Sequence, residues 1–131
     1  LPGIPGTEEL LSLVYSFASN SGRIGVQQVV NLLSTAPAKA FGLYPRKGAI
    51  RVGSDADLVL FNPDIAWTIS KETTHSASGY TPYEGMQVIG KPLMTYLRGR
   101  LVMGDGMYLG IEGNGLFIGQ HDVGRGKTIM H

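Results

Sequence analysis

The segment from Gly48 to Pro63, Gly-Ala-Ile-Arg-Val-Gly-Ser-Asp-Ala-Asp-Leu-Val-Leu-Phe-Asn-Pro, decides the predicted fold of this chain. Ile50 and Val52 flank a charged residue, as in a half-buried strand, and residues 56–61 form a nearly continuous apolar run rich in strand-favouring side chains. A Gly-Ser-Asp turn joins the two segments, and the Asn-Pro that follows ends the second because proline donates no ladder hydrogen bond. We therefore predict a hairpin here, with helices before it and short strands after it.

Helices are predicted before the hairpin. Residues 1–6 contain two prolines and two glycines, so they form a loop leading into a helix with Thr7 as its N-cap. A Ser-Asn-Ser-Gly sequence ends this helix, a second helix follows at 26–33, and a short third helix begins at Thr35 and ends at a left-handed Gly42. The apolar faces expected to be buried comprise Leu10, Leu11, Val14, Phe17 and Ala18 in the first helix and Val26, Val29, Val30 and Leu33 in the second.

Short strands are predicted after the hairpin, at residues 66–70, 87–89, 93–97, 101–103 and 107–109. Residues 71–83 show no periodicity and are expected to form an ordered loop. Gly90–Pro92 and Asp105–Gly106 carry turn signals, and the turn at Arg98–Arg100 pairs the strands on either side of it. The sequence therefore predicts a small sheet or sandwich, followed by a glycine-rich tail with too few apolar residues for its own core.

Composition excludes several classes of function. The net charge is +1 without a basic cluster, so we expect no nucleic-acid partner. The absence of cysteine excludes disulfides and thiolate metal sites, and it fits the expected location in a reducing cytoplasm. No apolar run approaches the roughly 20 residues of a membrane span, so no membrane partner is expected.

Several motifs together resemble the C-terminal third of the cyclic amidohydrolases. They comprise residues 31–43, 45–48, 53–59, 80–86 and 95–100. The D-hydantoinase and dihydropyrimidinase branch is the most similar, with allantoinase close behind. The resemblance extends to about Gly110 and implies an α/β fragment: the terminal helices of a (β/α)8 metal-dependent hydrolase barrel, then part of a small β-sandwich. Residues 1–47 would be the last barrel helices, 48–110 the strands of the composite sandwich, and 111–131 the tail.

The resemblance also implies the activity of a longer protein. Family members run to several hundred residues, and this chain starts at Leu1 without an initiator methionine, so we interpret it as their C-terminal portion. The intact enzyme would be a homo-oligomer that hydrolyses a C–N bond in a small cyclic amide of the hydantoin, dihydropyrimidine or allantoin type. One alternative is a non-catalytic dihydropyrimidinase-like oligomerising scaffold, and another is a self-contained binding module.

The cofactors implied by the resemblance are two divalent metal ions, expected to be zinc. Their ligands are a His-x-His pair, a carboxylated lysine, two further histidines and an aspartate, and a bridging hydroxide attacks the ring carbonyl. This chain has no His-x-His, and the aspartate would lie upstream of Leu1. We therefore expect no metal ligand and no catalytic residue in this segment, which would be inactive alone.

Isolated polar residues are interpreted as structural. His75, His121 and His131 are expected to be surface or hydrogen-bonding histidines. Asp55 and Asp57 have the spacing of a carboxylate pair for metal or acid–base chemistry, but a turn aspartate and a strand-entry aspartate are the favoured interpretation. The Gly-Arg-Gly-Lys-Thr sequence at 124–128 resembles the end of a phosphate-binding loop, yet His121 occupies the position of the required first glycine, so nucleotide binding is rejected.

The opening loop is the one segment for which the resemblance implies a substrate contact. Hydantoinases carry Pro-Asn-Gly-x-Pro-Gly after the last barrel strand, and Gly3, Pro5 and Gly6 match that pattern. Pro2 replaces the asparagine, so its backbone can accept a hydrogen bond but cannot donate one. Gly3 is the predicted substrate-lining residue, the alternative being a simple connection at the barrel edge. The aromatic segment 80–85 is expected to pack against the neighbouring barrel.

Overall fold

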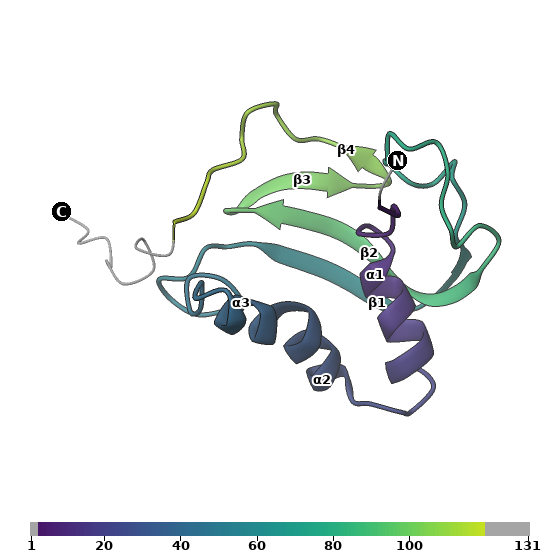
Figure 1. Ribbon diagram of the computed structural model, residues 1–131, viewed down its shortest axis with the longest axis horizontal. Coiled ribbons are helices and arrows are strands. Elements are labelled where there is room, and N and C mark those ends of the chain that lie inside the picture. The colour runs from purple at the N-terminus through teal and green to yellow at the C-terminus, as the bar shows by residue number, and fades with distance from the viewer. Residues whose placement is uncertain (1–2, 120–131) are drawn as a thin grey trace.

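The structure is a computed structural model that describes residues 3–119. Helices occupy the first part of the described chain, and a four-stranded antiparallel sheet with the strand order β1-β2-β3-β4 follows (Figure 1). The buried apolar side chains, Val29, Ala38, Ile69 and Val88, come from both parts. Within the described range, no helix has the length and apolar character needed to cross a membrane.

The first helix is α1 (Leu10–Val14), which continues as a π-helical turn, η1 (Tyr15–Ser19). It ends as predicted, because Gly22 follows with a φ of 77°. The predicted cap is wrong: the N-cap residue is Glu9, and it makes no side-chain capping bond. Helical order therefore begins later than the Thr7 signal indicates.

The second and third predicted helices are one continuous run, which comprises α2 (Val26–Val30), η2 (Asn31–Thr35) and α3 (Ala36–Ala40). Thr35 does not interrupt it: φ and ψ are helical at −68° and −46°, and the hydroxyl donates to the Gly48 carbonyl oxygen at 2.9 Å. A long-range bond thus replaces the predicted cap. Gly42 has a φ of 69°, which confirms the left-handed residue after the run.

The apolar faces predicted for these helices are only partly covered within the described residues. In α1 the buried side chain is Ser12, whereas Leu10 and Phe17 are 48% and 46% exposed. The helix contacts β2 through Ser16, whose Oγ accepts a hydrogen bond from the Ile89 amide at 3.0 Å, and through the Tyr15 ring beside Gly90. In α2 only Val29 is buried. Periodicity located these helices, but the side facing the sheet depends on tertiary contacts.

The predicted hairpin at Gly48–Pro63 does not form. Residues 49–57 contain no strand, and Ile50 and Val52 are 89% and 102% exposed. The second half belongs to β1 (Leu58–Thr68), which continues through Pro63. The proline is tolerated because β1 is an edge strand and its register with β2 shifts between Asn62 and Ala66, where no ladder bond is needed.

The strand β2 (Gln87–Leu97) also corrects a prediction. It is one 11-residue strand paired with β1, so Gly90–Pro92 is not a turn. Gly90 has a φ of 97° within the strand, and its carbonyl oxygen accepts a hydrogen bond from Trp67 Nε1 at 3.0 Å. The pairing with β1 therefore overrides the local Gly-Lys-Pro signal.

The other two turns are confirmed. Arg98 and Gly99, with φ of 48° and 79°, join β2 to β3 (Arg100–Gly104). Asp105 and Gly106, with φ of 51° and 72°, join β3 to β4 (Met107–Tyr108). Two successive left-handed residues are the requirement of tight hairpin turns. Residues 71–83 contain no helix or strand, in agreement with the predicted loop.

Candidate functional site

The opening segment, which we define as residues 3–9, leads into α1. Gly3 is exposed, has a φ of 106°, and lines neither of the two cavities described below. The ring of Tyr83 lies against the backbone of Gly6: a Cβ built at Gly6 would be 3.2 Å from Tyr83 Cε2. The aromatic segment 80–85 thus contacts the opening segment within this chain.

Glu8 and His75 join the opening segment to the loop of residues 71–86. The Glu8 carboxylate accepts one hydrogen bond from the His75 amide and faces His75 Nδ1, both at 2.8 Å. The other ring nitrogen, Nε2, is 3.1 Å from the Gly106 carbonyl oxygen. Because both ring nitrogens face acceptors, only the protonated imidazole satisfies both contacts. His75 is therefore a hydrogen-bonding histidine, as expected, and it connects three separate segments.

The hydrogen bond to Glu8, and then that to the Gly106 carbonyl, raises the pKa of His75 above its ordinary value of 6.5, although desolvation opposes the change. A raised folded-state pKa contributes stability that is complete below pH 6.5 and is lost as the pH rises through the folded value. Solvent weakens this contribution, since the His75 and Glu8 side chains are 39% and 42% exposed.

We expect His75→Gln to lower stability more at pH 6 than at pH 9, because only the imidazolium attracts the Glu8 carboxylate. Urea unfolding midpoints of the wild type and the variant at the two pH values measure this difference. Glu8→Gln is the matched control, and in that background the pH dependence of the His75→Gln effect should disappear. An equal loss of stability at both pH values would contradict the prediction.

Glu9 and Thr81 form a second link, and both are buried, at 4% and 6% exposed. The Thr81 hydroxyl donates to Glu9 Oε1 at 2.8 Å and accepts from the Tyr83 amide at 3.2 Å. A buried carboxylate needs such a donor, since an unpaired buried charge is strongly unfavourable. Two adjacent glutamates therefore hold the opening segment against the same loop.

A cavity of about 640 Å³ lies between α1 and the sheet. Its lining includes Ser12, whose hydroxyl is buried and makes no hydrogen bond within the described residues. The Lys91 ammonium lies 5.4 Å from the centre of the Trp67 ring, and both residues line the cavity. His75 and Glu8 lie at it too, so the cavity combines an apolar surface with charges of both signs.

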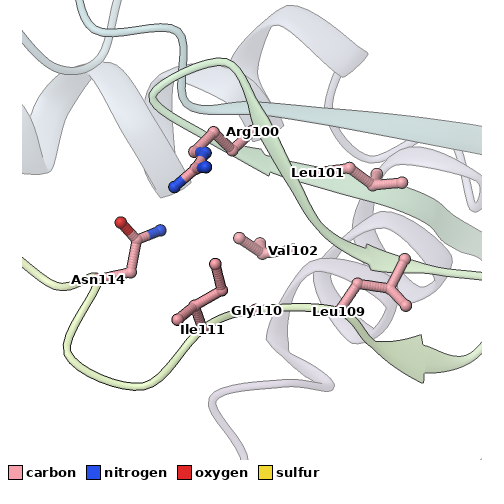
Figure 2. A pocket seen from close by; sticks show the side chains of 7 residues that line it. All are labelled: Arg100, Leu101, Val102, Leu109, Gly110, Ile111 and Asn114. Atoms are coloured by element: carbon pink, nitrogen blue, oxygen red, sulfur yellow. The ribbon is translucent and has the colours of Figure 1, made fainter.

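A smaller cavity of about 350 Å³ lies between β3 and the segment after β4. Figure 2 shows the Arg100 guanidinium and the Asn114 amide at one end and Leu101 and Leu109 at the other. The Asn114 backbone carbonyl also accepts a hydrogen bond from Arg98. This cavity contains neither a carboxylate nor an imidazole, so its lining offers no general base.

Asp55 and Asp57 are held by basic side chains. Asp55 contacts Arg46 Nε and Lys47 Nζ, both at 3.0 Å, and Asp57 contacts Lys47 and accepts from the Arg98 amide at 2.8 Å. Burial raises the pKa of Asp55, but the hydrogen bonds from Lys47 and Arg46 outweigh it, and the pKa lies below its ordinary value of 3.8. The contacts agree with the interpretation of a turn aspartate and a strand-entry aspartate.

A model of the amidohydrolase family matches residues 9–102. The chain belongs to the amidohydrolase family. It is 45% identical to the D-hydantoinase of Ralstonia pickettii over 116 residues, which are 88% of this chain and 25% of that protein. It is 41% identical to the dihydropyrimidinase of Rattus norvegicus, over 88% of this chain and 22% of that protein. The predicted resemblance is confirmed.

The fold of this amidohydrolase chain also matches solved structures. A D-hydantoinase structure superimposes with a TM-score of 0.85 at 45% identity, over 88% of this chain and 25% of that structure. The chain therefore spans about a quarter of the length of the relatives that it matches.

The described residues do not fit the paired metal site that the resemblance implies. Across residues 3–119, no three His, Asp or Glu side chains come together to hold a metal ion. His121, His131 and the segment 124–128 lie outside the described residues.

Sequence reasoning missed the roles of Glu8, Glu9 and Thr81. In the helix predicted from Thr7, Glu8 and Glu9 fall in the first turn, where the helix dipole favours negative charge, and this gives both residues an ordinary local explanation. Their partners lie 67 and 72 residues away in the chain, so no local pattern could reveal them. The one local signal is a pair of adjacent acidic residues two positions after Gly6.

Proposed function

We propose that the full-length protein containing this chain hydrolyses a C–N bond in a small cyclic amide of the hydantoin, dihydropyrimidine or allantoin type. The single observation that carries this proposal is the 45% identity to a D-hydantoinase along 88% of the chain. The TM-score of 0.85 to a D-hydantoinase structure supports it.

We propose that this chain is the C-terminal portion of that enzyme. Residues 1–47 would supply the last helices of a (β/α)8 barrel, 48–110 strands of a composite β-sandwich, and 111–131 a tail. The change from helix to strand between Ala40 and Leu58 supports the first boundary. The exposed apolar residues on the helices, including Phe17 and Val30, support a larger body that covers them.

The proposed enzyme depends on two divalent metal ions, with zinc as the proposed identity. Since the donors described in this chain do not fit such a site, the ligands would come from other parts of the protein. Bound metal ions would polarise the ring carbonyl and activate water. This chain would help to position the substrate through Gly3, the proposed substrate-lining residue. Gly3 starts the segment that Glu8 and Glu9 hold against the loop of residues 71–86.

A non-catalytic, oligomerising scaffold is the alternative, and it is less favoured because the relatives named above are a D-hydantoinase and a dihydropyrimidinase. We further propose a cytoplasmic homo-oligomer. The absence of cysteine from this chain is consistent with that compartment.

Ring opening by the full-length protein tests the proposal. We expect the purified full-length protein loaded with zinc to open hydantoin, dihydrouracil or allantoin. The appearance of the ring-opened acid measures this reaction, and a chelator should abolish it. The 131-residue chain alone, with added zinc, should show none. The proposal would be contradicted if the full-length protein opened none of the three rings with any divalent metal. Turnover by the isolated chain would contradict the assignment of the metal ligands to other parts of the protein.

A further inference from the structure

We propose that Glu9 and Thr81 are positioning residues, whose buried hydrogen bond holds the opening segment in place for the substrate. The proposal rests on the proposed function, because it assigns these residues a part in that reaction. Neither residue would touch the reacting atoms. Their contribution is to fix the backbone of the opening segment, which begins with Gly3.

The support on which the opening segment rests is itself fixed to the sheet. The end of the loop of residues 71–86 is bonded to Ile69, which precedes the loop and is fully buried. The Ile69 amide donates to the Met86 carbonyl, and the Gly85 amide donates to the Ile69 carbonyl, both at 2.9 Å. The Glu84 carboxylate accepts from the Lys71 amide at 2.8 Å and closes the loop on itself. The loop is therefore a defined surface.

The opening segment meets this surface at three points. The Gly6 backbone lies against the Tyr83 ring, Glu8 binds the His75 amide, and Glu9 accepts from the Thr81 hydroxyl. Only the last contact is buried at both ends. Thr81 also accepts from the Tyr83 amide, so one hydroxyl fixes both the glutamate and the backbone that carries the aromatic ring.

Within residues 3–119, none of the described contacts joins Gly3 itself to the loop. Gly3 is exposed, and a Cβ built on it meets no atom within 4 Å. Its position therefore depends on the contacts that hold the segment further along. Among these, the Glu9–Thr81 bond is the one whose carboxylate and hydroxyl are both buried, so water cannot readily replace either partner.

The matched pair Thr81→Val and Thr81→Ser in the full-length protein tests the proposal. Valine has the shape of threonine but leaves Glu9 without its donor, whereas serine keeps the hydroxyl. We expect Thr81→Val to accelerate amide hydrogen exchange in residues 3–9 by about tenfold and to raise KM for the ring substrate by about tenfold, with kcat within about twofold. Thr81→Ser should stay within about twofold of the wild type in all three quantities.

Gly6→Ala should displace the opening segment through its contact with Tyr83. It is the second test variant, to be used if Thr81→Val does not fold. Its Cβ would press on Tyr83 at 3.2 Å, whereas a Cβ at Gly115 meets nothing within 4 Å, so Gly115→Ala is its control. We expect Gly6→Ala to raise KM by about threefold or more, and Gly115→Ala to leave KM unchanged.

The outcomes separate the two proposals. The positioning role would be overturned if amide hydrogen exchange in residues 3–9 were unchanged in Thr81→Val. It would also be overturned if Thr81→Ser altered this exchange and KM as much as Thr81→Val does. If the wild type opens the ring and KM does not respond to Thr81→Val, only the positioning role is wrong. If the wild type opens no ring although exchange responds, the proposed function is wrong and the catalytic part of this inference falls with it.

Discussion

Replacing Gly90 with alanine is expected to destabilise the protein by about 3–5 kcal/mol, enough to abolish folding at 37 °C in a marginally stable background. A Cβ at this position would lie 2.4 Å from Tyr15 Cδ1 and 2.5 Å from Phe61 Cζ. These two rings pack edge to face with centroids 4.9 Å apart, so neither ring can move away from the new Cβ without breaking the contact between them. The φ of 97° adds backbone strain for any residue with a Cβ.

Gly53→Ala is the control for this prediction. Gly53 has a similar φ of 91°, but a Cβ there meets nothing within 4 Å. Its cost should therefore be the backbone term alone, about 1–2 kcal/mol. Urea unfolding of the full-length protein with each substitution measures both values. Equal losses for the two variants would show that the Tyr15–Phe61 contact does not require a glycine.

Ile69→Ala is expected to cost about 2–5 kcal/mol, because it leaves a cavity where strand β1 meets the loop of residues 71–86. Ile69 is fully buried, and its backbone makes the two hydrogen bonds that hold the loop ends together. Loss of its side chain should therefore loosen the loop as well as the core. Unfolding free energies and amide exchange in residues 71–86 measure the two effects.

Ile69→Val provides the graded comparison. It removes one carbon instead of three and should cost only about 0.5–1.5 kcal/mol, with little change in loop exchange. If alanine and valine had the same small effect, the site would be able to collapse around the smaller side chain. Ile69 would then not be the anchor of the loop.

Local signals predicted those parts of the fold that depend on the backbone conformation of a few neighbouring residues. The tight turns at Arg98–Gly99 and Asp105–Gly106 need positive φ at two successive residues, and glycine preceded by a tolerant residue meets that need. Gly42 ends the second helical run for the same reason. Loop 71–83 was predicted because no apolar period is present to order it as helix or strand.

Other parts depended on partners far away in the chain. The Gly-Lys-Pro sequence at Gly90 indicates a turn, but pairing with β1 and the Tyr15 and Phe61 rings make it part of a long strand. Pro63 indicates a strand end, but a register shift on an edge strand accommodates it. The residues Ile50 and Val52 alternate like a strand, yet the described chain offers them no neighbouring strand.

The candidate site divides in the same way. Gly3 followed from a motif resemblance, and it remains a prediction about the longer protein. The contacts of Glu8 and Glu9 with His75 and Thr81 required the structure, since each pair is separated by more than 60 residues.

The amino-acid sequence alone determined the family, the order of helical and strand regions, and the glycine-dependent turns, because these follow from motifs and from steric limits within a few residues. The tertiary structure alone decided which helix faces are buried, where β1 and β2 end, and how the opening segment is held. Those features depend on which distant groups meet, and a hydrogen bond or a ring contact between remote residues leaves no local trace in the chain.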